Sequence, residues 1–175
     1  HLAEEGVPLA SIDNAAVAFG MPIGPVELAD SVGLDVALNV SKVLGEALGR
    51  PTSSVLQGMV DDGFLGRKSG HGYYRWENGK AIKPTPASND VPSDITDRLM
   101  LAMVNEAVAC LHEQVVSDAD LLDAGVIFST GFAPFLGGPL NYAKERGTTA
   151  IVMRLNELAR VHGERFEPHS GWSDL

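Results

Sequence analysis

Apolar residues recur at helical spacing along nearly the whole chain, and this periodicity constrains the fold more than any other feature. Positions 95, 99, 103, 107 and 111 are all apolar and would form one face of a long helix. Further helices are expected over residues 8–19, 25–32, 35–48, 53–60, 117–128, 139–146 and 149–162. The sequence therefore predicts an all-α protein.

Short polar residues mark where several of these helices should begin. Asp35, Ser117 with Asp120, and Thr149 are expected to cap the helices that follow them, and Ser53 or its neighbour another. Their side-chain oxygens can accept hydrogen bonds from the first N–H groups, which have no partner within the helix.

The stretch 66–76 interrupts the helical pattern. It reads Gly-Arg-Lys-Ser-Gly-His-Gly, followed by two tyrosines, an arginine and a tryptophan. Glycines and alternating aromatic residues predict a turn and one short extended segment near residues 70–77. Residues 83–92 contain three prolines without apolar periodicity and are interpreted as a linker.

Composition excludes several classes of function. The 175 residues carry a net charge of −10, and such an acidic surface repels nucleic acids. We expect no membrane span, because no apolar run is long enough, and no signal peptide is visible. With Cys110 as the only cysteine, neither an internal disulfide nor a thiolate metal cage can form. A reducing compartment is permitted, and we expect a cytoplasmic location.

The two halves of the chain resemble each other. Residues 2–7 (Leu-Ala-Glu-Glu-Gly-Val) resemble residues 111–116 (Leu-His-Glu-Gln-Val-Val), and each segment precedes a helix that carries an apolar-Asp pair. A Gly/Pro-rich elbow follows at 19–25 and at 131–139, then a short helix that ends at a glycine. The offset drifts from about 109 to 114 residues. We interpret the pattern as a tandem duplication.

The duplication raises a question about His1. In the second copy, the matching segment ends a long helix that begins near Ile95, whereas the first copy starts where that helix should be finishing. A missing helix would leave its apolar partner surface open. We interpret His1 as a cut made by cloning or proteolysis; the alternative is a naturally shorter first repeat.

Residues 19–35, from Phe-Gly-Met-Pro-Ile-Gly-Pro onward, and residues 65–74 resemble the C-terminal domain of 3-hydroxyacyl-CoA dehydrogenases. Residues 98–107 and 131–139 resemble the second helical unit of the large multifunctional β-oxidation proteins. The resemblance implies two related helical units, similar to the C-terminal part of 6-phosphogluconate dehydrogenase and lacking the Rossmann domain. The expected boundaries are 1–82 for the first unit, 83–92 for the linker and 93–175 for the second, diverged unit.

The resemblance also implies where the chemistry is done. The family oxidises a 3-hydroxyacyl-CoA with NAD, and its catalytic His and Glu and its NAD-binding loop lie on a preceding Rossmann domain. No Gly-x-Gly-x-x-Gly follows a strand here. We therefore assign no catalytic, cofactor-binding or metal-binding residue to this chain, and we expect the fragment to be inactive alone. The family places an Asn before an Arg in the first helix; the second copy has Asp97 before Arg98, which argues against a working site there.

Seven residues are candidates for substrate binding. Those in the elbow would form a wall of the acyl pocket, although a plain helix–helix turn would need the same residue types. The 66–83 segment has a net charge of +4, and its candidates would attract the CoA phosphates. Alternatively, these basic residues belong to a solvated turn or contact an acidic neighbour. The candidates are Phe19, Met21, Pro22, Gly24, Pro25, Arg67 and Lys68.

Other residues are given structural roles. The five histidines show no metal-ligand spacing and are assigned no catalysis. Phe132, Phe135 and Leu136 are expected in the core between the repeats.

The expected partners are the acyl-CoA substrate, the missing Rossmann domain, and a second copy or a thiolase-type subunit. Two other functions stay open: the helical second domain of another Rossmann-linked dehydrogenase, acting on a sugar acid or hydroxy acid, and a purely structural association module.

Overall fold

The structure is a computed structural model, and it describes residues 1–48, 52–84 and 92–175. These residues are predominantly helical, which confirms the all-α prediction. The chain divides into two compact units, His1–Val17 with Ile23–Pro92, and Ala18–Pro22 with Ser93–Leu175. Residues 85–91 of the predicted linker lie outside the described residues. The domain boundaries expected from the sequence remain a proposal.

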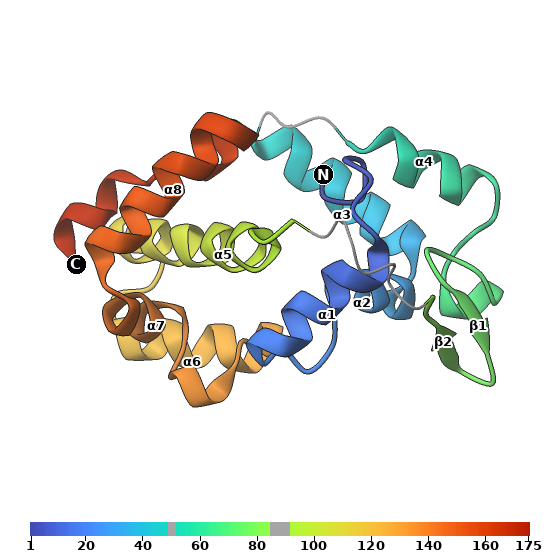
Figure 1. The fold of residues 1–175 in the computed structure, drawn as a ribbon, viewed down its shortest axis with the longest axis horizontal. Helices are drawn as coiled ribbons and strands as arrows, with labels where there is room; N and C mark the ends of the chain where they lie inside the picture. Colours follow the sequence, from blue (N-terminus) through green and yellow to red (C-terminus); the bar gives the residue numbers. More distant parts are fainter. Residues whose placement is uncertain (49–51, 85–91) are drawn as a thin grey trace. The chain divides into compact units, whose positions relative to one another are not determined.

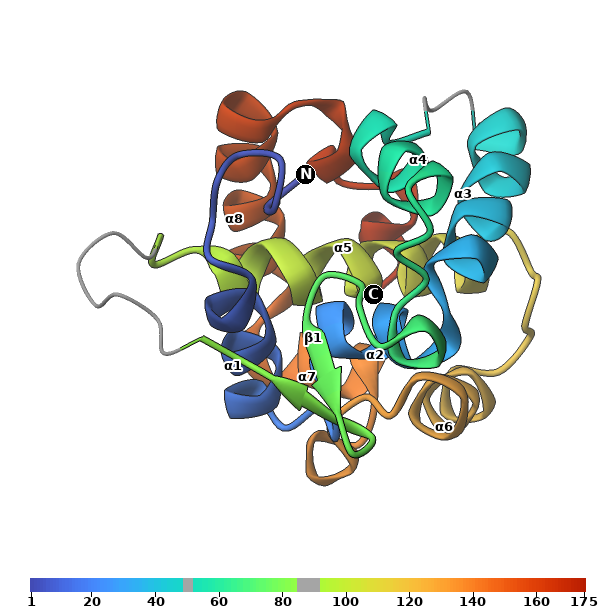
Figure 2. The same ribbon diagram turned by 90° about the vertical axis from the view of Figure 1, so that its right-hand side faces the viewer.

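Unit 1 is built from four helices in its described part, α1 (Leu9–Phe19, which runs into unit 2 at its end), α2 (Pro25–Val32), α3 (Leu34–Leu48) and α4 (Ser54–Asp61). Helices α3 and α4 lie side by side (Figure 2). Between them the side chains of Leu34, Leu38 and Leu56 form a small core. Further buried apolar side chains of unit 1 lie on α1, on α2 and on a short strand, among them Ile12, Val26 and Trp76.

A two-stranded hairpin follows the single-turn helix η1 (Arg67–Ser69). Strand β1 (Arg75–Glu77) pairs antiparallel with β2 (Lys80–Ile82), with Trp76 opposite Ala81. The sequence predicted one extended segment, and the second strand was missed. Its signal was the Asn78-Gly79 pair, since both residues have positive φ, as a two-residue hairpin turn requires.

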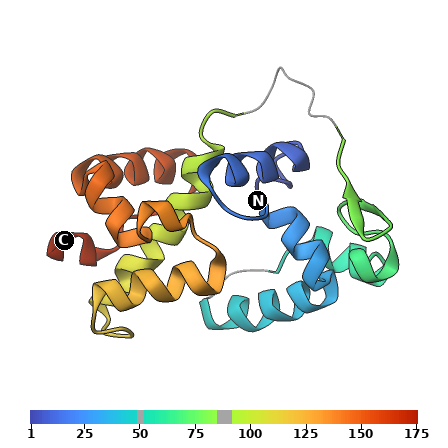
Figure 3. The ribbon, with the colours of Figure 1, turned by 90° about the horizontal axis from the view of Figure 1, so that it is seen from below.

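Unit 2 is arranged around α5 (Ile95–His112). Helix α8 (Thr148–His162) lies on one side of α5, and α6 (Ala119–Thr130) and α7 (Pro139–Arg146) lie on the other (Figures 1 and 3). Short 3-10 turns complete the unit at Pro134–Leu136, Glu164–Phe166 and Ser170–Asp174. The core residues of α5, α7 and α8 include Leu101, Val104, Leu140, Ile151 and Leu155, all fully buried.

The predicted positions of the helix caps were only partly correct. Ser53 caps α4 as expected, its hydroxyl accepting the N–H of Leu56. Helix α6 is capped by Asp118 instead of the predicted Ser117 box. Helices α3 and α8 each begin directly after a glycine, one residue before the predicted caps Asp35 and Thr149. Those two side chains therefore lie in the first turn of their helices.

The expected aromatic core was also partly wrong. Phe132 is fully buried in unit 2, whereas Phe135 is 76% exposed. Phe135 lies in the 3-10 turn Pro134–Leu136, where three consecutive residues point in different directions. None of the helices in the described ranges is long and apolar enough to cross a bilayer.

The same contact, an aspartate that accepts backbone N–H groups at the start of another helix, joins α1 to α2 and α6 to α7. Asp13 of α1 accepts hydrogen bonds from the N–H groups of Val26 and Glu27 at the start of α2. Asp123 of α6 does the same for residues 140 and 141 of α7. A proline precedes both pairs of N–H groups, so each helix begins with no unsatisfied donor in these positions.

Glycine is required where this carboxylate approaches the elbow. A Cβ added to Gly24 would lie 2.2 Å from Asp13, whereas one added to Gly125, in the middle of α6, would meet nothing within 4 Å. We expect Gly24→Ala to lower the free energy of unfolding by about 2–3 kcal/mol, because the buried carboxylate must move off its donors. The control Gly125→Ala should raise it by up to about 1 kcal/mol. Urea unfolding measures both, and equal effects of the two changes would contradict this account.

Candidate functional site

The elbow residues predicted to bind substrate fall into two groups. Phe19 ends α1 and packs edge-on against Phe132 and Tyr142, with ring centroids 5.4 and 5.3 Å apart, all within unit 2. Met21 and Pro22 also belong to unit 2, the first half-buried and the second exposed. The remaining two, Gly24 and Pro25, form the start of α2 in unit 1. The need to start a helix therefore explains Gly24 and Pro25 without a role in binding. The half-buried side chain of Met21 is available for contact with a ligand.

The turn that carries Arg67 and Lys68 is fixed to α2 by one carboxylate. Asp30 is fully buried, and its oxygens accept hydrogen bonds from the N–H groups of Tyr73 and Tyr74 at 2.8 Å and from Trp76 Nε1 at 3.0 Å. A Cβ on Gly72 would lie 2.2 Å from Asp30 Oδ1. The glycines of this motif therefore permit close approach of the loop to α2.

The basic side chains of this turn have nearby partners. Lys68 Nζ lies 2.5 Å from Asp35 Oδ1, and this hydrogen bond lowers the pKa of Asp35. The guanidinium of Arg67 lies 5.9 Å above the ring of Trp76. Arg75 pairs with Glu77 at 2.7 Å. The positive potential of the segment is therefore smaller than its formal charge of +4 suggests.

Lys83 and Tyr74 complete a polar cluster around Asp13. The Tyr74 hydroxyl donates to Asp13 Oδ2 at 3.0 Å, and burial together with the charge of Asp13 raises the pKa of Tyr74. Lys83 Nζ lies 3.1 Å from Asp13 and 2.6 Å from Glu27. Burial opposes the charge of Lys83, but these two carboxylates outweigh it and raise its pKa. The polar groups of this cluster are occupied by one another, which suits a structural cluster.

An apolar hollow of about 540 Å³ lies elsewhere in unit 1. Its walls come from the N-terminal segment and α4, and from Tyr73; a hydrogen bond of 2.7 Å joins Ser53 to Glu4 on its rim. None of the seven predicted binding residues lines it. The sequence offered no signal for this hollow, because its walls come from segments about 50 residues apart.

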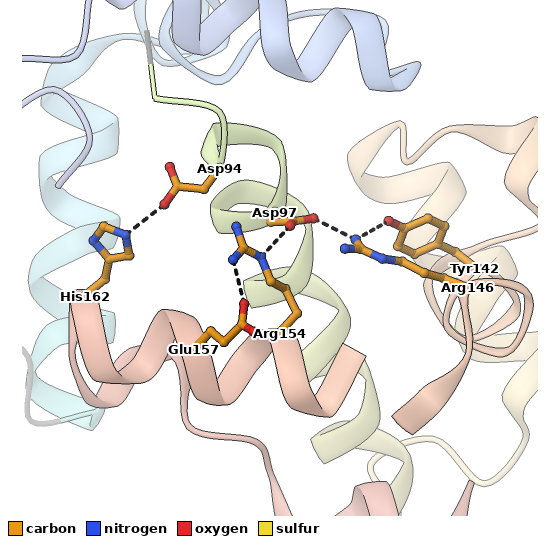
Figure 4. Close-up of polar contacts among 7 residues, drawn as sticks. All are labelled: Asp94, Asp97, Tyr142, Arg146, Arg154, Glu157 and His162. Carbon is orange, nitrogen blue, oxygen red and sulfur yellow. Dashed lines mark hydrogen bonds and ion pairs between the residues drawn. The ribbon is translucent and has the colours of Figure 1, made fainter. Parts of the chain in front are cut away.

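Asp97, at the position where the family resemblance places an Asn, is the centre of an ion-pair network in unit 2 (Figure 4). Its two oxygens accept hydrogen bonds of 2.7 Å from Arg146 Nη1, at the end of α7, and from Arg154 Nε in α8. Arg146 also reaches the Tyr142 hydroxyl, and Arg154 reaches Glu157. The carboxylate is fully used in joining three helices.

Asp97 gives unit 2 a specific acid dependence. Burial opposes ionisation of this carboxyl, but the two arginines outweigh burial and lower its pKa below 3.8. Its stabilisation is therefore complete above pH 3.8 and is lost as the pH falls through the folded-state pKa. We expect Asp97→Asn to lower the free energy of unfolding at pH 7 by about 2–3 kcal/mol, a difference that shrinks towards zero in strong acid.

Glu157→Gln is the matched control, because the Glu157 side chain is 52% exposed and binds the same Arg154. It should change the stability by less than about 0.5 kcal/mol at any pH. Urea titrations between pH 2 and pH 7 make the comparison. A pH-independent loss for Asp97→Asn would show that its charge is not what matters.

The C-terminal turns are attached to α5 by the side chains of Asn105 and His112. Asn105 Oδ1 accepts the His169 N–H at 3.0 Å and Trp172 Nε1 at 2.7 Å. His112 Nδ1 lies 2.6 Å from Asp174 Oδ2, and its ring packs edge-on against that of His169. Among the described residues no group of three His, Cys, Asp or Glu is arranged to hold a metal ion.

Two solved structures of similar fold are dehydrogenases. The chain matches 3-hydroxybutyryl-CoA dehydrogenase from Escherichia coli with a TM-score of 0.80 and 22% identity, over 99% of this chain and 55% of that one. It matches the dehydrogenase part of multifunctional enzyme 1 from C. elegans with a TM-score of 0.70 and 21% identity, over 97% and 42% of the two chains. At these identities the likeness establishes the fold.

Sequence comparison finds similarity to the same class of enzymes. Residues 1–76 match the family model of the 3-hydroxyacyl-CoA dehydrogenase C-terminal domain. The chain is 36% identical to the fatty acid oxidation complex subunit alpha of Vibrio vulnificus over 98% of its length, and 38% identical to that of Idiomarina loihiensis over 93%. The chain spans about a quarter of the length of these relatives, 26% and 25%.

Proposed function

We propose that this chain is the helical substrate-side region of an NAD-dependent 3-hydroxyacyl-CoA dehydrogenase that acts in fatty-acid β-oxidation in the cytoplasm. The observation that carries the proposal is the family match over residues 1–76, together with similarity to fatty acid oxidation subunits along nearly the whole chain. The mutual hydrogen bonds and ion pairs of the polar cluster around Asp13 indicate a structural role, so the proposal assigns this cluster no part in catalysis.

In the intact enzyme a Rossmann domain would hold NAD and supply the acid–base pair, and the cofactor would accept the hydride. Residues 1–175 would hold and cover the acyl end of the substrate. We place Met21 in the acyl pocket, with Phe19, Pro22, Gly24 and Pro25 shaping the elbow that presents it. The CoA phosphates would bind Arg67 and Lys68. Trp76 would orient Arg67, and Asp35 would orient Lys68 while neutralising part of its positive charge.

Association is the second role of this region in the proposal. The region would bind a second copy of the chain or a thiolase-type subunit. The similarity to proteins named as subunits of a fatty acid oxidation complex favours this role. A structural role alone would leave substrate binding unaffected by changes at the elbow.

The isolated chain should not catalyse the reaction. We expect purified residues 1–175 to produce no NADH from 3-hydroxyacyl-CoA and NAD, and to bind no NAD in a titration, because the proposal assigns both steps to another domain. The intact enzyme, assayed in parallel, is the positive control. NADH production by the isolated chain would overturn the assignment of the chemistry.

Met21→Ala tests the acyl pocket in the intact enzyme. A flexible thioether in contact with an alkyl chain contributes about 1–3 kcal/mol, so kcat/KM should fall roughly 5- to 150-fold for long acyl groups and much less for short ones. Pro22→Ala, a change at the exposed neighbour in the same elbow, is the control for local backbone effects. A lowered melting temperature with an unchanged chain-length profile would make Met21 a packing residue instead.

A further inference from the structure

The segment that carries Met21 is attached to the core of unit 2 on its N-terminal side. The Phe19 ring lies edge-on to the rings of Phe132 and Tyr142, with centroids 5.4 and 5.3 Å apart. Phe132 is fully buried and Tyr142 is half-buried. Edge-on aromatic pairs add to the free energy of apolar burial. Phe19 therefore cannot move without disturbing the core of unit 2.

The two Gly/Pro elbows, residues 19–25 and 131–139, touch each other reciprocally. Gly20 follows α1 and Gly131 follows α6, and both have positive φ, 117° and 72°. A Cβ added to Gly20 would lie 2.6 Å from Cε1 of Phe135. One added to Gly131 would lie 2.7 Å from Cγ of Pro22. Each glycine thus lies against a side chain of the other elbow, and neither position has room for a side chain of its own.

Phe135 contributes to this contact although it contributes little to the core. Its side chain is 76% exposed, on the 3-10 turn Pro134–Leu136. The edge of its ring lies close to Gly20, the residue before Met21. Loss of this ring should therefore cost the fold little free energy, but it should free the backbone beside Met21.

We infer that the second elbow, through Phe135 and Gly131, fixes the position of Met21 and thereby sets the discrimination between acyl chains of different length. Met21 lies between Gly20 and Pro22, the two residues that the second elbow contacts. A methionine side chain has three rotatable bonds, so only a fixed backbone on both sides confines the region that its thioether reaches. Phe135 and Gly131 are positioning residues, which act through Met21. The inference rests on the acyl-binding role proposed for Met21.

Methyl NMR tests the contact between the elbows in the 175-residue chain. The sequence has five methionines, and Met21→Ala identifies the methyl signal of Met21 among them. We expect Phe135→Ala to lower the order parameter of the Met21 methyl group, because its backbone is less confined. The control is Phe128→Ala, at a phenylalanine of α6 that is 89% exposed, and it should leave the order parameter unchanged. An unchanged order parameter in Phe135→Ala would overturn the inference.

Kinetics in the intact enzyme tests the consequence for specificity. Phe135→Ala should lower kcat/KM for long acyl groups about tenfold relative to short ones, within the roughly 100-fold that a displacement of about 1 Å can cost. Phe128→Ala should leave this ratio unchanged. In a Met21→Ala background, Phe135→Ala should not change the ratio further, because it acts only through Met21. Additive effects of the two changes would show that Phe135 acts independently of Met21 and would overturn the inference.

The same assays separate a failure of this inference from a failure of the proposed function. A changed ratio for Met21→Ala with none for Phe135→Ala would overturn the inference and leave the proposed function standing. An unchanged ratio for Met21→Ala would remove the proposed acyl pocket and, with it, the effect on specificity. Phe135→Tyr keeps the ring and should match the native protein in the order parameter, the ratio and the melting temperature. A loss of chain-length discrimination in Phe135→Tyr would contradict the role given to the ring.

Discussion

The fold depends on a buried carboxylate that caps a helix from a distance. Asp13 lies on α1 and accepts hydrogen bonds from the first N–H groups of α2. Asp123 lies on α6 and does the same for α7, and a Gly/Pro elbow separates the two helices of each pair. Such a cap does more than a local one, because it fixes the angle between two helices as well as satisfying backbone donors. The favourable interaction of a negative charge with a helix N-terminus helps to offset its burial. This contact explains the residues of the elbow. Glycine lets the carboxylate approach the backbone closely, and proline occupies the first helical position, where no N–H is needed.

The helices and the duplication could be predicted from the sequence, because both depend on local periodicity and on repeated motifs. The contacts that hold the loop 66–76 could not. Asp30 lies over 40 residues before the tyrosine N–H groups that it binds, and nothing in its neighbours distinguishes it from a solvent-exposed aspartate. The cap of α6 was predicted wrongly for a related reason: Ser117, Asp118 and Asp120 stand close together at its start, and tertiary packing decides which one is used.

The charge of the candidate site could not be predicted from the sequence either, because it depends on contacts between distant residues. Summing the charges of residues 66–83 predicted a basic island, but the side chains of Lys68, Arg75 and Lys83 each meet a carboxylate. Three of these acids, Asp13, Glu27 and Asp35, lie far away in the sequence. Formal charge along a segment therefore overstates the field that a substrate would meet, and the elbow, where Met21 stays half-buried, is the stronger part of the predicted site.

The two units solve the same packing problem with different chemistry. In unit 2 the central helix is held by an ion pair shared between two arginines, which gives specificity of register but ties stability to the ionisation of one acid. In unit 1 the positions 114 residues earlier are Val32 and Val40, which are 54% and 51% exposed. Valine side chains can make only apolar contacts, which do not depend on pH, so these two positions cannot form the ion pairs that hold α5 in unit 2.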